Sequence, residues 1–140
     1  MQALQKECLE QNCNMILYGD NATFLAIKTI SNTSKGRGIG LANELSLEYQ
    51  DNEILHVKPI RDILSKEVAY FCEYRSLSTF LHSSITTGMD KKASINRMTL
   101  DFIVGLENDF PSTVSTVTRT AYKIPSLAPI AAKKCIICRG

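Results

Sequence analysis

Two cysteines near the end of the sequence have the spacing of half a zinc site. Cys135 and Cys138 form a Cys-x-x-Cys pair, whereas a structural zinc ion usually takes four ligands. The other three cysteines stand apart, as do His56 and His82. The sequence therefore predicts zinc at Cys135 and Cys138 only if further ligands come from elsewhere. It indicates no other cofactor.

Two basic segments have the residue types that bind phosphate groups. Residues 34–38, SKGRG, alternate cations with glycine, and residues 91–97, KKASINR, lead into a predicted helix. Cations and the amides of a helix N-terminus both attract phosphate. The first segment could equally be a solvated cap of the helix before it, and the second could be plain exposed surface. The candidate RNA-binding residues are Lys35, Arg37, Lys91, Lys92 and Arg97.

A third motif, GDNAT at residues 19–23, follows a predicted strand and opens a predicted helix. Ligands bind at such positions in open α/β sheets. We favour a structural interpretation, in which Gly19 gives the turn its freedom and Asp20 or Asn21 caps the helix. The sequence contains no Walker motif and no histidine clustered with carboxylates, so we predict no catalytic residue.

The length and composition of the chain limit the class of protein that can carry these motifs. The chain has 140 residues, of which 44% are hydrophobic and 21% charged, with a net charge of +2. These values are typical of one ordinary globular domain and permit an RNA partner without requiring one. We expect no signal peptide, and no apolar run in the sequence approaches the length of a membrane span. We expect a protein of the cytoplasm that does not contact membranes.

The hydrophobic pattern predicts an α/β fold. We expect helices over residues 3–12 and 21–32, a buried parallel strand over 14–20, and a second strand over 53–60. Residues 41–53 are expected to be irregular. Helices follow over 62–77 and 94–110, the second capped by Ser94. The sequence is divided into residues 1–61, the α/β part, and residues 62–140, the helical part with the Cys-x-x-Cys tail.

Helical spacing also predicts which side chains are buried. In helix 62–77 the predicted core face includes Val68, Phe71 and Cys72. In helix 94–110 the predicted core face is Ile95, Met98, Phe102, Leu106 and Phe110.

A stretch rich in hydroxyl groups, FPSTVSTVTRT at residues 110–120, is predicted to be a further helix. Val114, Val117 and Ala121 share one helical face. Threonine and serine can donate to carbonyls one turn earlier, so the remaining faces need not be exposed. We expect this helix to pack against the helix that begins at Ser94.

Three segments resemble the family of the second subunit of the cytoplasmic tRNA 2-thiolation complex. Residues 92–124, which contain FPSTVSTV, are similar to its C-terminal signature, and a late Cys-x-x-Cys follows. Residues 17–38 are similar to its Leu-Gly-Asp-x-Ala-Thr block with a Gly-Arg-Gly loop. Residues 57–71 are similar to its Pro-Met-Arg-Asp and Lys-Glu-Ile segment.

The resemblance implies a fold and a function. The fold would be a partial Rossmann-like sheet of the ATP-pyrophosphatase type (adenine nucleotide alpha hydrolase-like), followed by a helical region. The function would be support of 2-thiolation of the wobble uridine in cytosolic tRNAs, in a heterodimer with a catalytic sister subunit. Sulfur would come from a thiocarboxylated ubiquitin-related modifier, which would be an indirect partner of this subunit. Full family members begin with an earlier region, so we expect this chain to be a C-terminal part of a longer protein or a truncated product.

The same resemblance implies that the subunit does not catalyse the reaction. Catalytic relatives carry a histidine where Asp20 stands, an aspartate near Thr23 and a glutamate near Lys28. Replacing carboxylates by a cation would spoil a site for a magnesium nucleotide. Two alternatives stay open. The chain could be an ATP-dependent tRNA sulfurtransferase with sulfur on Cys135 or Cys138, or a module that binds only protein.

Overall fold

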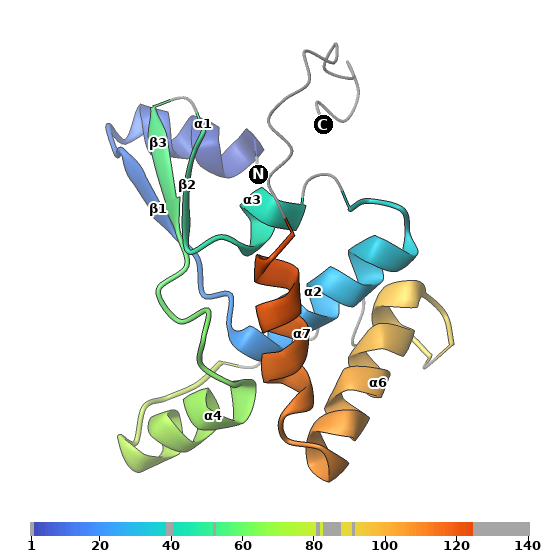
Figure 1. Cartoon of the computed structure of the whole chain (residues 1–140). Coiled ribbons are helices and arrows are strands. Elements are labelled where there is room, and N and C mark those ends of the chain that lie inside the picture. The colour runs from blue at the N-terminus through green and yellow to red at the C-terminus, as the bar shows by residue number, and fades with distance from the viewer. Residues whose placement is uncertain are drawn as a thin grey trace.

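The computed structural model describes residues 2–38, 41–51, 53–80, 82, 88–90 and 92–124. Lys91, Cys135 and Cys138 lie outside the described residues. The strands lie together at one end of the molecule and α2, α6 and α7 form a group at the other (Figure 1). In chain order the elements are α1 (Gln2–Glu10), β1 (Met15–Leu17), α2 (Ala22–Ser34), α3 (Leu41–Leu45), β2 (Glu48–Asp51), β3 (Ile54–Val57), α4 (Ser65–Tyr74), α6 (Ile95–Asp109) and α7 (Thr113–Tyr122).

The sheet has the order β1-β3-β2. Strand β3 pairs parallel with β1, so that Ile16 lies opposite His56, and antiparallel with β2, where Tyr49 lies opposite His56. Both predicted strands are confirmed, and so is the parallel pairing of the first. The prediction that residues 41–53 are irregular is wrong, because this segment forms α3 and β2.

The prediction that β1 is buried is also wrong. Met15 and Leu17 are exposed, Leu17 to 65%. Strand β1 stands at the edge of the described sheet, and its outward side chains are not covered by any other described element. A continuous apolar run is typical of a strand that is packed against other elements on both faces. Among the described residues, no element packs over the side chains of Met15 and Leu17.

Helix α2 lies at the centre of the hydrophobic core. Its Ala22 and Ala26 pack against Ile103 of α6 and Val114 of α7. Alanine side chains let neighbouring helices approach closely, so both later helices can contact α2. The division predicted between residues 61 and 62 therefore does not separate two cores among the described residues. As a domain boundary it stays a prediction.

A second cluster also packs against α2, where Leu25 contacts Leu41, Leu45 and Ala121. Leu41 and Leu45 stand four residues apart, so the short helix α3 presents both to α2.

The hydroxyl-rich segment forms α7, as predicted. Val114 and Ala121 are buried. Thr118 Oγ1 donates to the carbonyl of Val114 over 3.0 Å, and Thr120 Oγ1 donates to that of Thr116 over 2.8 Å. Back-bonding of this kind satisfies hydroxyl groups inside a packed helix. Helix α7 contacts α6, as expected, and also α2 and α3.

The predicted core face of α6 is wrong, and that of α4 is only partly correct. In α6 the side chains of Ile95, Met98, Phe102 and Phe110 are exposed. The buried residues of α6 are Thr99, Ile103 and Glu107, because these face α2 and its neighbours. In α4 no residue is fully buried: the predicted Val68 and Cys72 are half-buried, whereas Phe71 is exposed. None of the helices in the described part of the chain combines the length and the apolar character that a membrane span requires.

Candidate nucleic-acid interface

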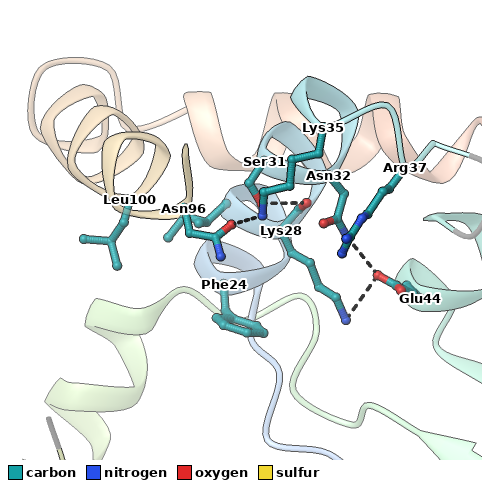
Figure 2. A pocket seen from close by; sticks show the side chains of 10 residues that line it. Phe24, Lys28, Ser31, Asn32, Lys35, Arg37, Glu44, Asn96 and Leu100 are labelled. Carbon is teal, nitrogen blue, oxygen red and sulfur yellow. Dashed lines mark hydrogen bonds and ion pairs between the residues drawn. The ribbon is translucent and has the colours of Figure 1, made fainter. Parts of the chain in front are cut away.

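A cleft of about 670 Å³ lies between α2 and α6, with α3 at one side (Figure 2). Three cations, Lys28, Lys35 and Arg37, line it together with the apolar side chains of Phe24, Ile27 and Leu100. The predicted residues Lys35 and Arg37 therefore share one surface, and Lys28 adds a third positive charge to them.

The turn after α2 directs the chain back along this cleft. Helix α2 ends at Ser34, Lys35 is its C-cap, and Gly36 has a φ of 71°. Glycine adopts this left-handed conformation without a steric penalty. The amide of Arg37 then donates to the carbonyl of Asn32 over 2.8 Å. The interpretation of SKGRG as a helix cap is thus confirmed, and it leaves both cations on the cleft.

One contact joins the two predicted basic segments. Lys35 Nζ donates to Asn96 Oδ1, across 61 residues of sequence. Asn96 lies in the first turn of α6, next to Arg97 and four residues after Lys92. The packing of α6 on α2 therefore places the end of the second basic segment beside the first.

The cleft is lined by more positive than negative side chains. Its carboxylate, Glu44, lies 3.3 Å from Lys28 Nζ and accepts a hydrogen bond from Asn32 Nδ2 over 3.1 Å. No carboxylate among the described residues pairs with Lys35 or Arg37. The rim near these two residues is therefore positive, which favours anionic ligands.

The remaining predicted residues are placed differently. Arg97 is largely covered, and its Nη2 lies 3.4 Å from Asp101 Oδ1, so it stabilises its own helix. Lys92 is exposed at the entry of α6. The phosphate-binding role of Arg97 stays a prediction. Lys91, predicted to bind phosphate, and the Cys pair, predicted to bind zinc, fall outside the described residues.

The GDNAT turn joins α2 to α4. Asn21 Oδ1 caps α2 by accepting from the amide of Phe24 over 2.9 Å, and it also accepts from Ser65 Oγ. Thr23 Oγ1 accepts from the amide of Ser65 over 3.1 Å. The amide of Ala22 donates to the carbonyl of Ile63 over 2.8 Å. These polar groups are engaged within the fold, and the predicted cap by Asn21 is confirmed. The predicted role of Gly19 is wrong, because its φ is not positive and a Cβ there would meet no neighbour.

Sequence reasoning missed an aromatic cluster around the fully buried His56. Its ring stacks on Tyr49 with a centroid distance of 4.5 Å, and its Nδ1 lies 2.9 Å from Tyr18 Oη. Lys58, only 3% exposed, lies with Nζ 5.0 Å from the centre of the Tyr49 ring. The facing positions of Tyr49 and His56 could be found only after recognising β2.

Burial changes the acid–base properties of this cluster. It lowers the pKa of His56 and that of Lys58, because a charge is less stable away from water. Burial, followed by the neighbouring Tyr18, raises the pKa of Tyr49 to about 12. In the described part of the chain, no three His, Cys, Asp or Glu side chains come together as metal ligands.

Comparison with known proteins identifies the family. The sequence model named Cytoplasmic tRNA 2-thiolation protein 2 matches residues 94–140. Curated proteins of this name match most of the chain: that of Danio rerio is 33% identical over 138 residues, or 92% of the chain, and that of Homo sapiens 36% over 130 residues, or 88%. The chain belongs to this family.

The chain spans only part of the length of these family members. It covers 28% of the Danio rerio protein, 25% of the human protein and 35% of that of Pyrenophora tritici-repentis, which is 31% identical over 134 residues. Since the match is partial, the activity and partners of the whole relatives are not carried over to this chain directly.

A solved structure shows the fold of this family member. The chain is similar to the U34-tRNA thiolase NcsA from Methanococcus maripaludis, solved with its [4Fe-4S] cluster. The TM-score is 0.67 at 18% identity, and the similarity covers 86% of this chain and 39% of the thiolase. The predicted α/β fold class is therefore confirmed, and the chain shares the fold of this thiolase.

Proposed function

We propose that the chain supports 2-thiolation of the wobble uridine in cytosolic tRNAs by binding tRNA rather than by catalysing sulfur transfer. The observation that carries the proposal is the joined basic surface, in which Lys35 contacts Asn96 while Lys35 and Arg37 have no described carboxylate partner. Its fold matches that of a U34-tRNA thiolase, and its relatives are named for tRNA 2-thiolation.

A non-catalytic role is supported by how three residues are used. Thr23 accepts a hydrogen bond from α4, Asn21 caps α2, and Lys28 pairs with Glu44. These contacts join or stabilise helices at the place where the resemblance predicts the altered catalytic block. A positive Lys28 beside Glu44 lowers the negative charge available to a magnesium ion.

We propose a catalytic sister subunit as the protein partner, in a cytoplasmic heterodimer that receives sulfur from a thiocarboxylated ubiquitin-related modifier. The exposed apolar side chains of α4 and α6, among them Phe71, Met98 and Phe102, support contact with further protein surface. Zinc at Cys135 and Cys138, with ligands from the partner, is part of this proposal. Metal analysis of the purified complex tests it.

Filter binding of unmodified tRNA to the full 140-residue chain tests the RNA contact. The double variant Lys35→Gln/Arg37→Gln should bind more weakly, and the dependence of affinity on salt should become less steep by about 1.5 in log–log slope, as expected for two lost phosphate contacts. The matched control is Lys6→Gln/Arg75→Gln. Both control residues are exposed and neither lines the cleft.

Equal losses in both double variants would show that binding depends on net charge alone and would contradict the proposed site. Binding that does not weaken with salt would argue against phosphate contact altogether. The rival hypothesis, a sulfurtransferase in its own right, predicts tRNA-stimulated release of pyrophosphate by the isolated chain. We expect none.

A further inference from the structure

Phe24 occupies a position that the core does not explain. It belongs to α2, but its neighbours Ala22, Leu25 and Ala26 face the core while its own side chain is 49% exposed. The ring lines the cleft between α2 and α6 and also two adjoining hollows, one beside Val104 and one beside Tyr18. Figure 2 shows the ring below Asn96 and Lys28, at the floor of the cleft.

The other polar side chains that line the cleft supply two kinds of contact, positive charge and a hydrogen-bond donor. Lys35 and Arg37 carry positive charge at the rim. Asn96 accepts from Lys35 through its side-chain oxygen, which leaves the amide nitrogen of Asn96 as a hydrogen-bond donor. An exposed aromatic face, flanking amides and nearby cations are the combination by which proteins hold unpaired nucleotides.

We propose that the cleft takes an unpaired segment of the tRNA, with one base stacked on Phe24 and phosphates of neighbouring nucleotides beside Lys35 and Arg37. This inference rests on the proposed function, and it adds that the chain selects single-stranded over paired RNA. In a duplex the bases are stacked on each other and their faces are inaccessible. The cleft volume of about 670 Å³ lies within the usual range for small-ligand sites.

Charge complementarity favours RNA over other occupants. The cleft's carboxylate, Glu44, is already held by Lys28 and Asn32, so a cationic ligand would find no free partner there. An acidic peptide could pair with Lys35 and Arg37, but its carboxylates would make no use of the exposed Phe24 ring. A short unpaired RNA segment uses both, because its phosphates contact the cations and a base stacks on the ring.

The chain contains no tryptophan, so the substitution Phe24→Trp introduces a single fluorescent probe at the site. A single-stranded oligouridylate of about eight nucleotides, within the site size of single-strand binders, should quench the tryptophan emission of the Phe24→Trp variant. Duplex RNA with the same number of phosphates should not. Phe24→Ala should weaken binding of the oligouridylate by about 5- to 100-fold, with its salt dependence unchanged because no phosphate contact is lost.

Phe102→Ala is the matched control. Phe102 is exposed to a similar degree on α6 but does not line the cleft, so its removal should leave oligouridylate affinity unchanged. Phe24→Tyr should retain binding, because tyrosine keeps the aromatic face. Phe24→Leu should lose it, because leucine keeps only the apolar volume. Thermal unfolding of each variant verifies that the fold is intact.

The outcomes separate this inference from the proposed function. If Lys35→Gln/Arg37→Gln weakens tRNA binding while Phe24→Ala and Phe24→Leu bind like the wild type, the stacking site is wrong and the basic tRNA surface stands. If duplex RNA quenches the emission of the Phe24→Trp variant as well as oligouridylate does, selection of unpaired RNA is wrong. Quenching by an acidic peptide but not by oligouridylate would show that the cleft takes a peptide and would overturn the stacking site, while filter binding of tRNA decides the proposed function.

Discussion

Helices α6 and α7 are neighbours in sequence and use their apolar side chains in opposite ways. Helix α7 buries small residues, Val114 and Ala121, and together with them Thr118. Helix α6 exposes large ones, including Met98 and Phe102, while it buries Thr99, Ile103 and Glu107. The helix with the larger apolar side chains therefore contributes fewer of them to the described core.

The reason lies in the surface that α2 offers. Where Ala22 and Ala26 face outward from α2, neighbouring backbones come close and leave little room for aromatic rings. Small β-branched side chains fit there. Threonine also fits, because its hydroxyl is satisfied by its own helix and needs no partner from across the interface. Side-chain size and internal hydrogen bonding, rather than total hydrophobicity, decide which face is buried.

The largest predicted difference in unfolding free energy is between the same substitution at two valines. Val114 of α7 is fully buried and Val104 of α6 is 45% exposed. Val114→Asp places a carboxylate among Ala22, Ala26 and Ile103 and should lower the free energy of unfolding by about 4 kcal/mol or more. Val104→Asp should change it by less than about 0.5 kcal/mol. Urea titration followed by circular dichroism measures both.

Because Val114→Asp can unfold the chain outright, Val114→Ala gives a graded comparison, with an expected loss of about 1–3 kcal/mol. If Val104→Asp proved as damaging as Val114→Asp, the outer face of α6 would be covered in solution. The contrast between the two helices would then disappear.

A second comparison uses adjacent residues of α6. Ile103 is fully buried and its neighbour Phe102 is 57% exposed. Ile103→Ala leaves a cavity in the main core cluster and should cost about 2–4 kcal/mol of unfolding free energy. Phe102→Ala removes a larger side chain but should cost about 0.5 kcal/mol or less. A greater loss for Phe102 would show that the predicted stripe, and not Ile103, faces the core.

Much of the fold could be predicted from sequence because several signals are local. Ser94 caps α6 by accepting from the amide of Arg97, as predicted, and Asn21 caps α2. The spacing of Val114, Val117 and Ala121 correctly predicted α7. The segment over residues 41–53 was missed because α3 is five residues long and β2 has a single apolar residue, Tyr49. Such elements depend on distant contacts rather than on their own pattern.

The site was predictable to a smaller extent. Lys35 and Arg37 could be chosen from composition and spacing alone, and the structure places them on one cleft. Phe24 and Asn96 could not, because their proximity depends on how α6 packs against α2, far away in the sequence. The wrong face predicted for α6 has the same origin. Periodicity indicates that a helix has an apolar stripe, but it does not say which partner lies opposite.

The smallest predicted effect concerns hydroxyl groups of α7. Thr118 Oγ1 is buried and donates to the carbonyls of Val114 and Ser115, at 3.0 and 3.1 Å, whereas the exposed Thr120 makes a similar bond to Thr116. Thr118→Val keeps the shape and removes a bond that water cannot replace, so the unfolding free energy should fall by about 1 kcal/mol. Thr120→Val should change it by less than about 0.5 kcal/mol, because water can hydrogen-bond the exposed group. If Thr118→Val stabilised the chain instead, the hydroxyl would be merely tolerated in the core, and only the small size of its side chains would explain why α7 is buried.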